Sequence, residues 1–120
     1  MTSEEKLRLA LVDSLLAMTM PLAEVMRQLA AMSWDYEGVG VPLTKQHLSN
    51  VLGRYLRGEI SEADIEMWAN QVEVRDDVQI DPSYEPDIKD VLHELANPVL
   101  THVLDLARAE HLVGTLNSTK

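Results

Sequence analysis

The stretch Gly58–Asp81, GEISEADIEMWANQVEVRDDVQID, decides the fold because it contains a helix end, a helix start and a carboxylate-rich exit. Gly58 follows a helical pattern, and glycine readily takes the left-handed conformation that ends a helix. The hydroxyl of Ser61 can accept from a backbone N–H of the next first turn, and Asp64 is a near match to the Glu or Gln of a capping box. The sequence therefore predicts that one helix ends near residue 58 and another begins after residue 61.

The helix predicted after Ser61 has two different faces. Its apolar residues recur at helical spacing and form one face: Ile65, Trp68, Ala69 and Val72. The other side carries Glu62, Glu66, Asn70 and Glu73. We expect the tryptophan face to be buried in the core and the carboxylate face to be exposed to water.

Length and composition indicate one globular domain. The chain has 120 residues, of which 46% are hydrophobic, so it can form a core of its own. It has no cysteine, which excludes a disulfide framework and a thiolate site and is typical of a reducing cytoplasm. The charged opening TSEEK has no signal-peptide pattern, and charged residues interrupt the longest apolar run. We therefore expect a cytoplasmic protein without a membrane segment.

Hydrophobic periodicity predicts an all-α fold, a compact bundle of five to six helices with an irregular loop at about 33–43. Residues 1–32 should form a helical hairpin or a helix kinked at Pro21, and residues 44–114 the helical core of the same domain. The predicted helices are 3–19, 22–32, 45–57, the helix after Ser61, 86–96 and 98–112, with Gly114 ending the last one.

Three features of this pattern leave alternatives open. The first and last predicted helices are apolar on two faces, which is typical either of a central core helix or of a homodimer contact. In the loop, Trp34 and Tyr36 either tuck against the core or face solvent as contact residues. Lys45, Arg54 and Arg57 make the helix at 45–57 basic, so we expect it to lie near the acidic helix that follows.

The charge of the chain is large and uneven. The net charge is −10, which argues against nucleic acid and against an anionic membrane surface as partners. Residues 61–90 contain ten acidic and two basic side chains, so one quarter of the chain carries most of the negative charge. Such a surface either only solvates the protein or attracts a positively charged partner protein.

The residues do not match known catalytic or metal-binding patterns. His93-Glu94 is only a fragment of the HExxH zinc motif. The aspartates Asp76, Asp77 and Asp81 lack the glycine and the terminal glutamate of an EF-hand loop. We therefore expect no metal, no cofactor and no enzymatic activity, with a metal-dependent enzyme that uses His93, Glu94 and these aspartates as a third hypothesis.

Residues 55–70, YLRGEISEADIEMWAN, together with Glu73 and the run Arg75-Asp76-Asp77, resemble a segment of small acidic helical bacterial proteins of the colicin-immunity-like kind. The same residues are also similar to an uncharacterised bacterial family with a WAN…E-R-D-D-like run. The resemblance covers less than a third of the chain. It implies a cytoplasmic protein that neutralises a toxin or another effector by direct binding.

We therefore expect an acidic protein-binding module that inhibits a basic partner protein, such as a toxin or a nuclease, by direct occlusion. The expected partner-binding residues are Glu62, Glu66, Glu73, Asp76, Asp77 and Asp81. The exposed part of this set should centre on residues 73–81, because some carboxylates should pair with the basic helix. The alternative is a structural or scaffold protein that self-associates, for example as a homodimer.

Overall fold

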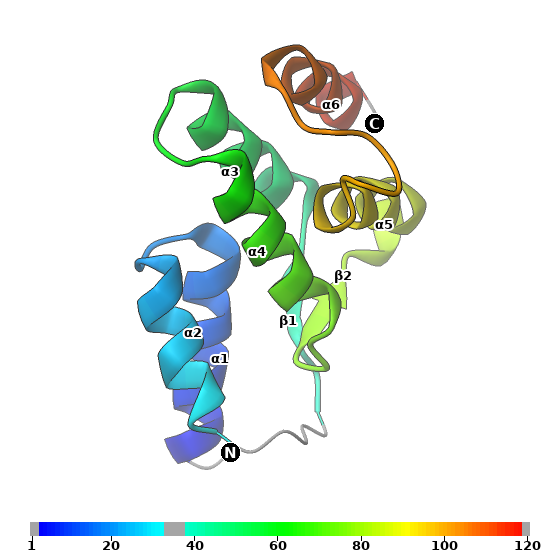
Figure 1. The fold of residues 1–120 in the computed structure, drawn as a ribbon. Helices are drawn as coiled ribbons and strands as arrows, with labels where there is room; N and C mark the ends of the chain where they lie inside the picture. Colours follow the sequence, from blue (N-terminus) through cyan, green and yellow to red (C-terminus); the bar gives the residue numbers. More distant parts are fainter. Residues whose placement is uncertain (1–2, 33–37, 119–120) are drawn as a thin grey trace.

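The structure is a computed structural model that describes residues 3–32 and 38–118, and within them the chain is all-α apart from one pair of short strands (Figure 1). The helices are α1 (Ser3–Ala17), α2 (Leu22–Ala30), α3 (Lys45–Leu56), α4 (Glu62–Glu73), α5 (Glu85–Ala96) and α6 (Leu106–Ser118). α1 and α2 lie side by side as a hairpin, α3 packs against α6, and α4 packs against α5. The all-α prediction is confirmed. The expectation for Trp34 and Tyr36 concerns residues outside the described ones.

The two central helices, α3 and α4, begin at side-chain caps, and the Ser61 cap of α4 was predicted. The side chain of Thr44 accepts from the backbone N–H of His47, and Ser61 accepts in the same way from Asp64. In both cases the third helical residue bonds back to the cap: Asp64 Oδ2 accepts from the Ser61 N–H at 2.9 Å, and His47 Nδ1 accepts from the Thr44 N–H at 3.1 Å. Gly58, with φ at +77°, provides the predicted left-handed turn between the helices.

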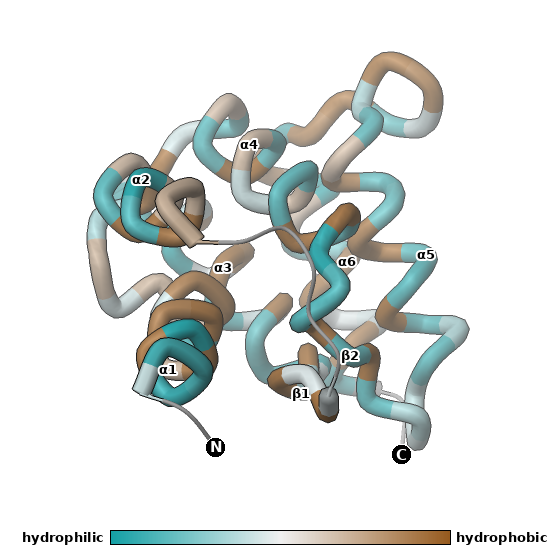
Figure 2. The backbone as a smooth tube through the Cα atoms, turned by 90° about the horizontal axis from the view of Figure 1, so that it is seen from below, coloured by the Kyte–Doolittle hydropathy of each residue, from teal (hydrophilic) through white to brown (hydrophobic). Residues whose placement is uncertain are grey.

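Trp68 is the central anchor of the core. Its side chain is fully buried, and its indole N–H donates to the backbone carbonyl of Leu15 at 2.7 Å. The last four carbonyls of a helix have no partner inside that helix, and this one near the end of α1 accepts both from Trp68 and, at 3.3 Å, from the Met18 N–H. The predicted tryptophan face of α4 is thus buried and contacts the end of α1, which also packs against α3 and β1. Figure 2 shows hydrophobic and hydrophilic residues interleaved along each helix, as amphipathic packing requires.

The strand pair is a feature that the sequence did not reveal. β1 (Val41–Leu43) and β2 (Val78–Ile80) run parallel, with Val41 opposite Val78. The next turn of chain is a short 3₁₀ helix, η1 (Pro82–Tyr84). Three residues are too few to show the alternation of a strand, and Pro42 removes a backbone donor and indicates a loop. Residues of the predicted loop at about 33–43 therefore pair with residues that lie between two predicted helices.

Gly40 permits the close approach of these two segments. A Cβ atom at this position would lie 2.7 Å from both the carbonyl carbon and the carbonyl oxygen of Asp77. The adjacent backbone bond, from the Val41 N–H to the Asp77 carbonyl, is 2.9 Å long. Glycine is therefore required at position 40, because the side chain of any other residue would clash with the backbone of Asp77.

We predict that Gly40→Ala lowers the free energy of unfolding by about 2 kcal/mol, because the added methyl group meets backbone that can move only with the strand. Gly114→Ala is the matched control, since Gly114 lies inside α6 with nothing within 4 Å of an added Cβ. The control should gain up to about 1 kcal/mol from better helix propensity. Urea unfolding measures both, and equal stabilities of the two variants would contradict the steric argument.

The last helix differs from the prediction. It begins at Leu106 rather than at Pro98, and Gly114 lies within it rather than at its end. Asp105 starts it: its carboxylate accepts from the Arg108 N–H at 2.7 Å, and its carbonyl accepts from the Ala109 N–H at 2.9 Å. The prediction of a helix at 98–112 was wrong because Asp105 is a strong N-cap within a segment whose apolar spacing is otherwise helical.

Stability should depend on the protonation of His47. Burial lowers the pKa of His47, which the charge of Asp13 only partly opposes, and the neutral ring is the form whose Nδ1 can accept from Thr44. A lowered folded pKa gives stability that is complete above the ordinary value of about 6.5 and is lost as pH falls through the folded value. Thermal unfolding should therefore show His47→Gln to be less pH-sensitive than wild type, because glutamine keeps the capping box without titrating. Equal loss of stability below pH about 6 in both proteins would contradict this assignment.

Candidate protein-binding site

The structure does not gather the six predicted partner-binding residues on one surface. Glu62 and Glu66 lie at the start of α4, where they line a groove against the α5–α6 connection. Glu73, at the other end of α4, lines a separate hollow with α5. Asp76 lines a third pocket, of about 210 Å³, with Met26 and Met32. Asp81 accepts from the Ser83 N–H at the start of η1.

Asp77 faces the interior. It is only 2% exposed, and Arg75 donates to both of its carboxylate oxygens, at 2.7 and 2.8 Å. The guanidinium of Arg8 on α1, itself 4% exposed, lies 3.8 Å from the same carboxylate. Asp77 is therefore an internal ion-pair residue that offers almost no surface of its own to a partner, although it lines the same pocket as Asp76. The sequence does not distinguish Asp77 from its neighbour Asp76, because both are aspartates and only the structure shows that Asp76 is exposed.

Asp77→Ala should lower the free energy of unfolding by about 3 kcal/mol or more, because two partly or fully buried guanidinium groups lose their carboxylate. Asp76→Ala removes the adjacent exposed carboxylate and should change stability by less than about 0.5 kcal/mol. Chemical denaturation of the two variants side by side measures the difference. If the two variants unfold alike, the buried ion cluster does not stabilise the fold.

A groove of about 440 Å³ lies between α4, α5 and the segment that connects α5 to α6. We call it the connection groove. Its lining residues are Glu62, Ala63, Ile65, Glu66, Glu94, Leu95, Pro98, Val99, Val103 and Leu104. It combines apolar walls with carboxylates, so it offers both apolar area and negative charge to a partner.

The connection itself exposes an unusual amount of apolar surface. Within the eight residues from 99 to 106, Val99 is 94% exposed, Leu100 79%, Val103 73% and Leu106 56%. These residues were predicted to form a broad apolar surface of the last helix, either in the core or at a homodimer contact. The core alternative is wrong for them, because they are exposed and all except Leu106 precede α6. Asn97 and Thr101 hold the turn through bonds to the end of α5, and buried Leu104 fixes its far end. Figure 2 shows this hydrophobic stretch in brown between α5 and α6. A clustered exposed apolar patch of this kind is typical of a contact surface.

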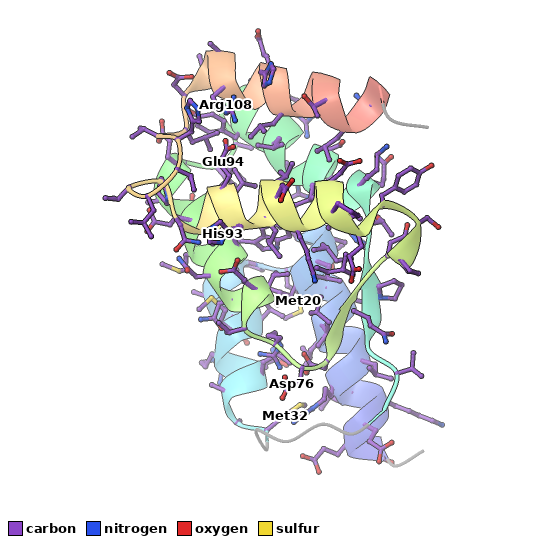
Figure 3. All side chains as sticks on the ribbon, turned by 90° about the vertical axis from the view of Figure 1, so that its right-hand side faces the viewer. Met20, Met32, Asp76, His93, Glu94 and Arg108 are labelled. Atoms are coloured by element: carbon purple, nitrogen blue, oxygen red, sulfur yellow. The ribbon has the colours of Figure 1, made fainter. Side chains whose placement is uncertain are left out.

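The charge of the groove comes from its α4 side. Glu62 is exposed, and its pKa is lowered by a hydrogen bond from its own backbone N–H and by the hydroxyl of Tyr55, which donates at 2.9 Å. It is therefore ionised at neutral pH. Glu66 is exposed one helical turn further on. On the opposite side, Glu94 accepts two bonds from Arg108, at 2.6 and 2.8 Å (Figure 3), which neutralises it.

The basic residues of α3 and its C-cap lie beside groups other than the six predicted carboxylates. Arg57 pairs with Glu59 at 2.7 Å, and the ammonium group of Lys45 lies 4.1 Å from the centre of the Tyr84 ring. Arg54 lines a pocket together with Asp64. The acidic face of α4 is thus left largely for solvent or a partner.

The residues of the metal hypothesis point to different partners. His93 Nδ1 lies 3.2 Å from Glu73, whereas Glu94 is held by Arg108 on α6. Figure 3 shows Asp76 at the opposite end of the molecule from Glu94 and Arg108. Within residues 3–32 and 38–118, no three histidine, aspartate or glutamate side chains are grouped so that they could hold a metal ion.

Comparisons with known proteins give no family assignment: no family model matches the chain, and neither curated proteins nor solved structures include a match. In the described part of the chain, no helix has the length and apolarity needed to cross a membrane.

Proposed function

We propose that this chain is an acidic protein-binding module that inhibits a basic partner protein by covering its positively charged surface. The observation that supports this function is the connection groove, where two exposed carboxylates, Glu62 and Glu66, border an exposed apolar segment. Carboxylates speed association with a positive partner and favour it over others, while apolar burial supplies affinity. Glu73, Asp76 and Asp81 extend the negative field around this contact.

A second candidate function is self-association as a structural protein. It is favoured by the same exposed residues between 99 and 106, because water-exposed valine and leucine side chains can also be buried against a second copy. The net charge of −10 opposes it, since two copies repel each other. Light scattering across a dilution series separates the two functions.

The proposed function predicts that charge reversal at the acidic surface weakens binding to a basic partner. Purified basic proteins encoded beside this chain in its genome are the candidates, measured by calorimetry at low and high salt and by an assay of the candidate's own activity. Glu66→Lys/Asp76→Lys should weaken binding at least about tenfold at low salt, because two exposed attractive charges become repulsive. The salt dependence of binding should also fall, because fewer attractive charge pairs remain for salt ions to screen.

Glu4→Lys/Glu110→Lys is the matched control, since it produces the same net charge at exposed carboxylates outside the predicted set. It should bind almost as wild type does. Equal weakening by both double variants would mean that only the total charge matters, and the absence of binding by any basic candidate would contradict the proposed function.

A further inference from the structure

We propose that the connection groove binds an amphipathic, positively charged α-helix of the partner protein. The apolar face of that helix would lie on Val99 and Val103, and its cationic side chains beside Glu62 and Glu66. The inference rests on the proposed function and deepens it, because it names the kind of structure that the module recognises and the place where it binds.

The apolar part of the argument is the anchoring of the connection. Leu104 is 8% exposed and belongs to the core, so its burial holds the backbone of the connection in place. Val99 and Val103, which line the groove, are nevertheless 94% and 73% exposed. Apolar side chains held in place on a fixed backbone lose little further freedom when a partner covers them, so their burial contributes directly to affinity.

The charge part of the argument is the asymmetry of the groove. Glu62 and Glu66 are four residues apart on α4, which places them about 6 Å apart along the helix axis. Two cationic residues at i and i+4 of a second helix have the same spacing. Glu94 across the groove is already neutralised by Arg108, so only one side attracts cations. The complementary occupant is therefore a helix with an apolar face and a cationic edge.

The two helical walls of the groove also favour a helix over an extended peptide. α4 and α5, which form two of its sides, have their backbone N–H and C=O groups bonded within the helices. Neither wall offers a strand edge with which an extended peptide could pair. A helix satisfies its own backbone groups and needs only side-chain contacts, which is what these walls provide.

A synthetic peptide tests this inference. The probe is a labelled helical peptide about five turns long, with leucines at i, i+3, i+4 and i+7 and lysines elsewhere, measured by fluorescence anisotropy. A peptide with glutamate in place of lysine and one with the leucines scattered around the helix are the peptide controls. Wild-type protein should bind the first peptide at least about tenfold more tightly than either control.

Two variants of the protein locate the binding site. Val103→Ser and Glu66→Lys should each weaken binding of the leucine–lysine peptide about tenfold. Val74→Ser is the matched apolar control, because Val74 is likewise 73% exposed but lies outside the groove, and Glu110→Lys is the matched charge control on α6. Both controls should bind as wild type does. Circular dichroism and melting confirm that all four variants are folded.

Three outcomes would overturn the inference. The first is equal binding of the glutamate peptide, and the second is binding that Val103→Ser and Val74→Ser affect alike. The third is a homodimer that Val103→Ser dissociates, with no peptide bound. If Glu66→Lys/Asp76→Lys weakens binding to a basic partner protein but Val103→Ser does not, the groove inference fails while the proposed function stands. If the groove binds the peptide but no basic protein is bound, the proposed function fails instead.

Discussion

The carboxylate of Asp77, buried between two guanidinium groups, is the interaction on which the arrangement of the chain depends. Arg75 holds it from the same turn, and Arg8 brings α1 to it. The carbonyl of the same residue accepts from Val41 and starts the pairing of β1 with β2, where Gly40 leaves room for the contact. One residue thus ties the N-terminal helix, the strand pair and the end of α4 together. A buried carboxylate of this kind stabilises only while its charged partners are in place.

The acidic residues of the chain therefore serve different purposes. Asp77 is internal, Asp64 completes a helix cap, and Glu94 holds α6 onto α5 through Arg108. Glu62 and Glu66 are left at the surface, where they border the exposed connection. The acidic side chains are thus divided between internal contacts that stabilise the fold and exposed positions whose charge acts on the surroundings of the protein.

The sequence predicted the local elements well, because their signals are local. Ser61 caps the helix it was expected to cap, Gly58 makes the left-handed turn, and α5 runs to Ala96 as predicted. The errors have a common cause. The 98–106 segment has helical periodicity, but Asp105 caps α6 and makes it begin later than predicted. The spacing of valines and leucines in a sequence also does not tell whether these side chains are buried or exposed to water. An N-cap aspartate two residues after Val103 was the signal that could have corrected the boundary.

By itself, the sequence determined the all-α class, the helix caps, the tryptophan face of α4 and the concentration of negative charge, because each depends on residues within a turn or two of one another. Only the tertiary structure decided which carboxylates are available. Asp76 and Asp77 are neighbours of the same type, yet one is exposed and the other is 2% exposed, because Arg8, far away in sequence, packs against only one of them. The connection groove likewise combines residues from α4, α5 and the segment after it. Side chains that meet only through packing leave no pattern along the chain, because their spacing in sequence is set by the whole fold.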